Sequence, residues 1–332
     1  MSEPSLSVVI PVFNEAPHLP ATIGALRAAL DRAGFVPEVI VVDDGSSDGS
    51  GAVARAAADG HIPLRVLTQP NRGRFEARRA GLDAATGDFV LLLDARVILL
   101  PDALSFVLER VEAGELVWNG HVRIETDNAF GIFWRLLAEL AWREYFDDPR
   151  TTSFGPEEFD RYPKGTTCFF APRALLASAV ASFSTRYADV RLANDDTPVL
   201  RDLAARERIG ISPRFACVYS PRTTLRHFLR HALHRGVVFV DGHGTPESRF
   251  FPVVLAFFPA SAALAVAAVR RPTLLPAAAA ALGIGAAACG VSAGRTPREI
   301  RTLAAVTPLY AAGHGLGMWK GLAELVRARL GR

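Results

Sequence analysis

The sequence has few cysteines and almost no lysine. The three cysteines, Cys168, Cys217 and Cys289, lie far apart in 332 residues, and no pair has the CxxC spacing. Closely spaced cysteines build disulfide scaffolds and zinc knuckles, so both classes are disfavoured. Only Lys164 and Lys320 are lysines among 37 basic residues, and the net charge is +3. Arginine suits phosphate contacts, but this composition alone identifies no partner, and no nucleic-acid partner is predicted.

Two common phosphate-binding motifs are missing. No GxGxxG segment follows the first β-rich run, and no GxxxxGK[ST] occurs anywhere in the chain. Such loops let backbone N–H groups approach a diphosphate, so a dinucleotide site or a Walker-type site is disfavoured. The segment after the first run, PVFNEAPHL, also lacks the glycine- and lysine-rich loop that a nucleotidyltransferase would need.

The N-terminal third alternates between β-rich and helical patterns. The β-rich runs cover residues 6–13, 38–42, 64–67 and 89–93. This spacing predicts right-handed crossovers in an α/β fold with a doubly wound, mostly parallel sheet. Polar residues follow three of these runs, namely Asn14-Glu15, Asp43-Asp44 and Asp94. Ligands of such sheets bind beyond the carboxyl ends of the strands, so these residues mark the predicted site.

Acidic residues at strand ends have two interpretations. They bind the base or ribose of a nucleotide, or a divalent metal on a diphosphate. Alternatively, Asp-Gly and Ser-Asp pairs only form turns. We interpret Gly45, Asp48 and Gly49 as turn residues, and Asp44 and Asp94 as functional.

Two long stretches toward the C-terminal end carry no charge. They cover residues 252–269 and 274–293. At ~1.5 Å per residue each helix could cross a hydrocarbon core of ~30 Å, the first only just. Buried helices of a soluble protein normally show a polar face at helical spacing, which both runs lack. Two membrane helices are therefore predicted, whereas a third stretch, 303–319, contains His314 and several glycines and is a doubtful span.

A basic amphipathic segment precedes these runs, at residues 222–235. Its apolar residues at helical spacing are Leu225, Phe228, Leu229, Ala232 and Leu233, with arginine and histidine between them. A helix of this kind suits an anionic lipid surface. An ordinary surface helix has the same pattern, and only the neighbouring apolar runs favour the lipid surface.

Four blocks of the sequence resemble family 2 glycosyltransferases of GT-A fold. They are SVVIPVFNEAPHL, VIVVDDGSSDGS, QPNRGRFEARRAGLDAATGDFVLLLDA and NDDTPVLRDLAARERIG, in the order of the family. The tail, YSPRTTLRHFLRHALHRG with two apolar runs and HGLGMWKGL, looks like membrane-attached enzymes of bacterial exopolysaccharide (succinoglycan-type) synthesis. The resemblance implies a GT-A domain at 1–220, a basic interfacial segment at 221–250 and membrane helices within 251–332.

The family moves a sugar, with inversion, from a nucleotide sugar to an acceptor hydroxyl. The resemblance implies donor contacts from Pro11, Asn14, Glu15, Asp44, Arg78 and Asp94. It places Asp196, the second acid of Asp195-Asp196, on the position of the catalytic base, and both acids are predicted to be catalytic residues. From the residues alone, Pro198 predicts a helix start, where a carboxylate stays ionised and can accept a hydroxyl proton. One of the two acids is alternatively an N-cap, which leaves the other free.

The predicted metal motif departs from the family. The family has Asp-x-Asp or Asp-x-His where this chain has Asp94-Ala95-Arg96, and arginine cannot ligate a cation. Two outcomes stay open. Asp94 holds Mg²⁺ or Mn²⁺ together with the diphosphate and waters, or Arg96 neutralises the leaving diphosphate in place of a metal. His231 and His234 stand where the family tends to have Gln and Arg, and we predict them as contacts of the acceptor or the diphosphate.

The sequence thus predicts a membrane-attached glycosyltransferase at the cytoplasmic side of the cell membrane. Its expected partners are a nucleotide-sugar donor, a lipid-linked or saccharide acceptor in cell-surface or exopolysaccharide synthesis, and membrane lipids. The alternative is a catalytically inactive nucleotide-sugar-binding membrane scaffold protein, which donor turnover would exclude. A pore or transporter is disfavoured because the two apolar runs carry no charged residue.

Overall fold

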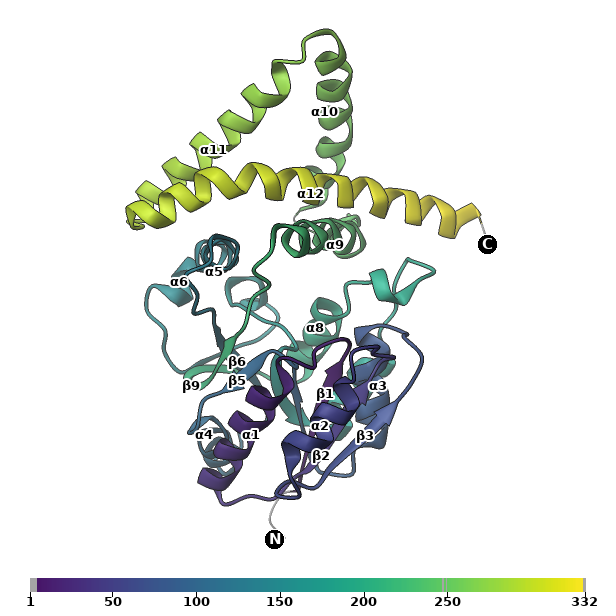
Figure 1. Cartoon of the computed structure of the whole chain (residues 1–332), viewed down its shortest axis with the longest axis vertical. Helices are drawn as coiled ribbons and strands as arrows, with labels where there is room; N and C mark the ends of the chain where they lie inside the picture. The colour runs from purple at the N-terminus through teal and green to yellow at the C-terminus, as the bar shows by residue number, and fades with distance from the viewer. Residues whose placement is uncertain (1–4, 247, 249, 331–332) are drawn as a thin grey trace. The chain divides into compact units, whose positions relative to one another are not determined.

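The computed structural model describes residues 5–246, 248 and 250–330 (Figure 1). Its contacts divide the chain into two compact units. The first comprises Met1–Glu125, Trp142–Ser184 and Asp195–Ser220, and the second comprises Thr126–Ala141, Thr185–Asn194 and Pro221–Arg332. Two segments inside the predicted 1–220 domain thus group with the C-terminal helices. The predicted domains also include residues 1–4, 247, 249 and 331–332, which lie outside the described residues.

One sheet forms the centre of the first unit. Among the described residues its strands follow the order β3-β2-β1-β4-β8-β6-β9-β5, with β7 beside β9. The strands are β1 Leu6–Val12, β2 Glu38–Asp43, β3 Leu64–Thr68, β4 Phe89–Leu93, β5 Val97–Leu99, β6 Trp118–Arg123, β7 Thr152–Phe154, β8 Cys168–Pro172 and β9 Ile209–Tyr219. The first four run parallel, which confirms the predicted doubly wound arrangement. Strand β8 is antiparallel to β4 and begins the mixed half of the sheet.

Helices cover both faces of this sheet. They are α1 Leu19–Ala33, α2 Ser50–Ala58, α3 Arg74–Ala84, α4 Ala103–Glu112, α6 Arg143–Phe146, α7 Arg173–Ala181 and α8 Asp196–Arg206, with a 3₁₀ turn at Phe159–Arg161. Alternate residues of β1 face opposite ways, so Ile10 packs in the core with α1 and α4 while Val9 faces α3. Gly81 allows α3 to lie this close, because a Cβ there would come within 2.3 Å of Val9 Cγ1.

The second unit is helical. Its elements are α5 Ala129–Ala141, a 3₁₀ turn at Val190–Leu192, α9 Leu225–His243, α10 Phe251–Arg270, α11 Leu274–Ser292 and α12 Pro297–Leu330. Helix α12 packs against α5, α9 and α11 (Figure 1). Phe228 and Ala232 of α9 are fully buried, so part of the apolar face predicted to meet lipid packs within this unit. The interfacial role of this segment stays a prediction.

Two of these helices have the length and composition of membrane spans. Helices α10 and α11 have mean hydropathies of 2.1 and 1.9 over their most apolar windows, and only 11% of each window is buried. Figure 1 shows both extending from the region of α12 and meeting at a loop. These helices indicate membrane association, as predicted. The third apolar stretch lies inside α12, and among the described residues α12 does not qualify as a span.

Candidate active site

The predicted polar residues gather where the chain changes direction across the sheet. From β1 the chain moves to β2 and β3 on one side, then returns to β4 on the other. Strand β1 pairs with β2 as far as Val12 opposite Asp43, but with β4 only as far as Val9 opposite Leu92. The two strands therefore diverge beside Pro11, and such a switch point is where ligands of α/β sheets bind.

The loops after β1 and β2 hold each other in place. Asn14 has a φ of 55°, which is unusual for a residue with a side chain. Its Oδ1 accepts a hydrogen bond from the backbone N–H of Ser47 at 2.9 Å, and its own N–H donates to Ser46 Oγ at 3.0 Å. The N–H of Glu15 donates to Ser50 Oγ at 2.9 Å. The loop after β1 is thus preorganised by side chains of the next loop.

Asp44 organises a third loop. Its side chain is buried, and it accepts hydrogen bonds of 2.8 Å from Gln69 Nε2 and from the backbone N–H groups of Arg72 and Gly73. Residues 69–73 lead into α3, so this carboxylate fixes the start of that helix. Its predicted contact with the base or ribose stays a prediction.

Arg78 joins the three carboxylates of the site. Its Nη2 lies 2.9 Å from Asp94 Oδ1, and its Nη1 lies 3.2 Å from Asp195 Oδ2 and 2.9 Å from Asp196 Oδ1. Arg74 lies one helical turn earlier on the same face of α3. Its Nη2 is 2.6 Å from Asp195 Oδ1 and 3.9 Å from Asp196 Oδ2. Three carboxylates and two guanidinium groups leave this cluster with one net negative charge.

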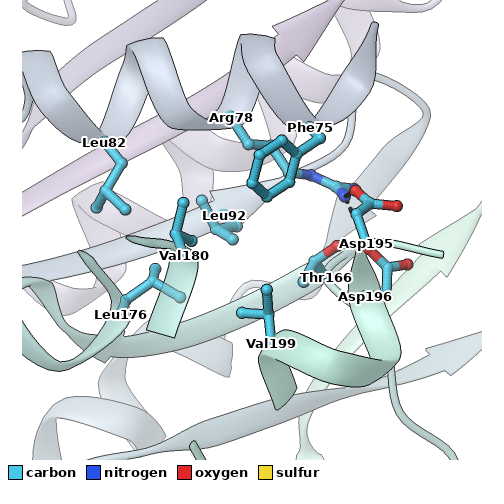
Figure 2. A pocket seen from close by; sticks show the side chains of 10 residues that line it. All are labelled: Phe75, Arg78, Leu82, Leu92, Thr166, Leu176, Val180, Asp195, Asp196 and Val199. Carbon is cyan, nitrogen blue, oxygen red and sulfur yellow. Dashed lines mark hydrogen bonds and ion pairs between the residues drawn. The ribbon is translucent and has the colours of Figure 1, made fainter. Parts of the chain in front are cut away.

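Figure 2 shows Asp195 and Asp196 at the start of α8, turned toward Arg78. Asp195 occupies the N-cap position, but its side chain makes no capping hydrogen bond. The capping alternative therefore fails for both acids, because the two arginines attract both carboxylates away from the helix end.

Asp196 is ionised at neutral pH. Burial alone would raise the pKa of this carboxyl group, but Arg74 and Arg78, with a hydrogen bond from Thr166, lower it to about 2. The same carboxylates raise the pKa of Arg74 well above its usual value. Thr166 Oγ1 donates to Asp196 Oδ1 at 2.5 Å. No described residue donates a hydrogen bond to Oδ2, so this oxygen is the one available to accept a proton.

An apolar pocket of about 20 Å³ lies beside this cluster (Figure 2). Its apolar lining consists of Phe75, Leu82, Leu92, Leu176, Val180 and Val199. Space of this size holds about one water molecule. The apolar wall lowers the local dielectric, which strengthens the ion pairs of the cluster.

The sequence-based prediction missed Arg74 and Thr166. Arg74 could have been found, because it precedes Arg78 by four residues in a helical pattern. Thr166 carries no local signal, since it lies in the irregular segment before β8 and reaches Asp196 only through the fold.

Arg96 and Glu15 form a separate pair. Arg96 Nε lies 3.0 Å from Glu15 Oε1 and 2.8 Å from Oε2. Glu15 follows β1 and Arg96 follows β4, so their contact crosses the switch point. Two residues predicted as separate donor contacts therefore act together.

The acidic residues of the site offer little to a divalent metal. Arg78 already pairs with Asp94 Oδ1, and a guanidinium stands two positions later where the family has a second ligand. Asp195 and Asp196 face the same two arginines. In the part of the chain that the structure describes, no group of three or more His, Cys, Asp and Glu residues is arranged to hold a metal.

The two histidines predicted as acceptor or diphosphate contacts belong to the second unit. Both lie on α9, and the ring centroid of His231 is 4.6 Å from that of Trp134 on α5. The roles assigned to His231 and His234 stay predictions.

A sheet whose strand order reverses beside a buried cluster of carboxylates and arginines is an arrangement typical of α/β enzymes. The chain belongs to glycosyl transferase family 2, which it matches over residues 7–175, just over half of its length. The family assignment made from the four sequence blocks is thereby confirmed.

Two curated relatives match about a third of this chain. The undecaprenyl-phosphate 4-deoxy-4-formamido-L-arabinose transferase of Aeromonas hydrophila is 40% identical over 111 residues, 33% of this chain and 34% of that protein. The protein of the same name from Pseudomonas aeruginosa is 36% identical over 126 residues, 37% of each chain. The chain thus aligns with little more than a third of the length of these relatives.

Two solved structures share the fold over nearly the whole chain. The mannosyltransferase PcManGT from Pyrobaculum calidifontis, in complex with GDP-Man and Mn²⁺, gives a TM-score of 0.53 at 22% identity, covering 99% of this chain and 87% of that one. S. aureus TarS 1–349, in complex with UDP-GlcNAc, gives 0.52 at 16% identity, covering 99% and 92%. The predicted GT-A fold is confirmed.

Proposed function

We propose that the protein is an inverting glycosyltransferase that moves a sugar from a nucleotide sugar to an acceptor hydroxyl. The observation that carries this proposal is Asp196, a carboxylate kept ionised beside the switch point with one oxygen available. The family, whose members transfer sugars, supports the same reaction.

In the proposed reaction Asp196 Oδ2 removes the proton of the acceptor hydroxyl. The acceptor oxygen attacks the anomeric carbon from the side opposite the diphosphate. The bond from that carbon to the diphosphate oxygen breaks, and the nucleoside diphosphate leaves with the electron pair. A positioned general base contributes typically ~10²–10⁴-fold to a rate. Asp195 has both oxygens on Arg74 and Arg78, so we assign it a positioning role.

The donor would lie along the ends of β1, β2 and β4. Asn14, Glu15 and Asp44 come from the first two strand ends, and Pro11 lies where β1 separates from β4. The nucleotide sugars bound to PcManGT and TarS support a donor of this class.

We further propose a lipid-linked saccharide as acceptor, with the catalytic unit on the cytoplasmic side of the cell membrane. The names of the curated relatives include undecaprenyl phosphate, a lipid phosphate. The exposed apolar surface of α10 and α11 supports a protein that works at a bilayer. His231 and His234 remain our candidates for contacts with the acceptor or the diphosphate.

We also propose that this protein needs a divalent metal less than relatives with two acidic residues in the motif. The solved complex of PcManGT contains Mn²⁺. In this chain Asp94 would be the protein ligand, and Mg²⁺ or Mn²⁺ bound there would neutralise the diphosphate. Arg96 in place of the second ligand weakens that site.

Asp196→Asn tests the proposed function. Transfer should fall by about 10²–10⁴-fold, whereas the affinity for the nucleotide-sugar donor should stay nearly unchanged. Asp83→Asn, an exposed aspartate of α3, is the matched control and should keep full activity.

Transfer at donor saturation and donor binding are measured on the same preparations, over a panel of UDP-, GDP- and dTDP-sugars. Near-normal turnover by Asp196→Asn would contradict the assignment of the base. Donor binding without turnover by the wild-type chain would favour the inactive scaffold instead.

A further inference from the structure

The guanidinium of Arg96 is held near the point where β1 and β4 diverge. Arg96 follows β4, and its backbone carbonyl accepts a hydrogen bond from the N–H of Ser220 at 2.9 Å, which ties it to the end of β9. Its side chain is only 15% exposed. Both the main chain and the side chain of Arg96 are therefore fixed in place.

The contact with Glu15 uses only one of the three nitrogens of this guanidinium. Glu15 accepts from Nε, whereas no described residue accepts a hydrogen bond from Nη1 or Nη2. A guanidinium presents its N–H groups in a planar fork that matches two oxygens of a phosphate. Glu15 thus orients Arg96 and leaves its terminal N–H groups for another anion.

The other charged groups of the site are already paired. Both terminal nitrogens of Arg78 contact carboxylates, and its side chain is 6% exposed. Asp94 belongs to that cluster through Arg78. The charged groups of the site therefore fall into the carboxylate cluster around Arg78 and the separate Arg96–Glu15 pair, in which the guanidinium contacts Glu15 only through Nε.

We propose that Nη1 and Nη2 of Arg96, oriented by Glu15, bind the diphosphate of the donor directly, so that binding does not require a divalent cation. The inference rests on the proposed function and deepens it by naming the phosphate-binding group. In transfer, the same guanidinium stabilises the negative charge that appears on the departing diphosphate when the bond to the sugar breaks. Glu15 is a positioning residue, since it acts through Arg96.

Nucleotide binding to the full-length protein in detergent tests this proposal. The probes are UDP, GDP, ADP and CDP with the corresponding nucleosides, titrated calorimetrically in EDTA and in Mn²⁺. The wild-type chain should bind its preferred diphosphate in EDTA, and Mn²⁺ should change the affinity by less than about threefold. Arg96→Gln should lose about 10- to 100-fold in affinity for the diphosphate, as expected for lost charge-assisted hydrogen bonds. Its affinity for the nucleoside should not change.

Four further variants sharpen the test. Arg27→Gln removes an exposed arginine of α1 and should bind like the wild type. Glu15→Gln should weaken diphosphate binding less than Arg96→Gln, again without affecting the nucleoside. Arg96→Asp restores the acidic motif of the family, so its diphosphate affinity should be poor in EDTA and should rise at least about tenfold with Mn²⁺. If Arg96→Gln does not fold, Arg96→Lys keeps the charge without the fork and should show an intermediate loss.

Two results would overturn the proposal while the proposed function stands. One is a wild-type chain that binds and transfers only with Mn²⁺ or Mg²⁺. The other is an Arg96→Gln variant that binds the diphosphate in EDTA as tightly as the wild type. A wild-type chain that binds no nucleotide or nucleotide sugar under either condition would instead overturn the proposed function, and this inference with it.

Discussion

Apolar side chains are buried in the sheet of the first unit but largely exposed on α10 and α11 of the second unit. Val9 and Ile10 of β1 are fully buried, whereas Val266 of α10 and Ile284 of α11 are 65% and 69% exposed. Burial of apolar surface is the main favourable term in folding. The first unit buries its apolar side chains by its own packing, whereas the α10–α11 pair leaves most of its apolar surface to the surrounding medium, which we expect to be lipid.

The two units also arrange buried charges differently. In the second unit Arg135 contacts Glu139 and Glu299, and Arg295 contacts Glu139, so two arginines meet two glutamates. The cluster around Arg78 instead sets three carboxylates against two guanidinium groups. A neutral network is sufficient to hold helices together. In the unbalanced cluster, Asp196 Oδ2 accepts no hydrogen bond from a described residue, as a catalytic base requires.

The largest effect is expected when the exposure of α11 to lipid is tested with a thiol reagent. Ile284→Cys in a Cys289→Ala background should resist a membrane-impermeant maleimide in vesicles, because the helix lies in hydrocarbon. Val36→Cys, at a 78% exposed position of the first unit, should react completely under the same conditions. Buried Cys168 and Cys217 supply little background. Equal labelling of the two sites would show that α11 faces water.

Removal of Arg78 tests the second contrast. Arg78→Gln leaves three carboxylates with Arg74 alone, and a broken buried ion pair typically costs about 3–5 kcal/mol. We expect a loss of this size in the free energy of unfolding, measured by chemical denaturation in detergent. The pKa of Asp196 should rise above about 2, so the acid limb of the activity profile should move to higher pH.

Arg135→Gln is the comparison for this prediction. Arg135 is 28% exposed, so solvent compensates part of its loss and the cost should be smaller. A loss for Arg135→Gln equal to that for Arg78→Gln would remove the distinction between the two clusters.

A smaller effect is expected where α9 and α12 cross. A Cβ on Gly317 would lie 2.0 Å from the carbonyl oxygen of Leu233, so Gly317→Ala must separate the helices. Overpacking of this kind costs about 1–3 kcal/mol. Gly285→Ala in α11 meets nothing within 4 Å and should be neutral or slightly stabilising. Thermal unfolding of both variants measures the difference, and equal melting temperatures would argue against close packing of α9 and α12.

The smallest effect concerns the basic face of α9. Arg226 and Arg230 are exposed and lie one turn apart, on the segment predicted to meet anionic lipid. Each should contribute about 1 kcal/mol to binding of an anionic surface, an effect that salt weakens. Flotation of Arg226→Gln/Arg230→Gln with anionic vesicles should therefore be reduced at low salt. If the double variant is recovered equally with anionic and neutral vesicles and as well as the wild type, only α10 and α11 would remain as the membrane contact.

Local patterns were sufficient to predict the parallel half of the fold and the apolar helices. The β-rich runs at 6–13, 38–42 and 89–93 become β1, β2 and β4 within a residue or two, because parallel strands buried on both faces are apolar throughout. The charge-free runs become α10 and α11, because length and hydropathy are properties of the segment itself. The acids at the strand ends could be located from the sequence because they directly follow these apolar runs.

Only the tertiary structure decided which of these residues meet. Arg78 reaches Asp94, Asp195 and Asp196 because the chain brings α3, the end of β4 and the start of α8 together. The grouping of 126–141 and 185–194 with the C-terminal helices likewise depends on contacts far apart in the sequence. The periodicity of a segment indicates whether it forms a helix or a strand and which of its faces is buried. The partner of a charged side chain at the end of an element is set by the crossovers between elements, and no local pattern records that.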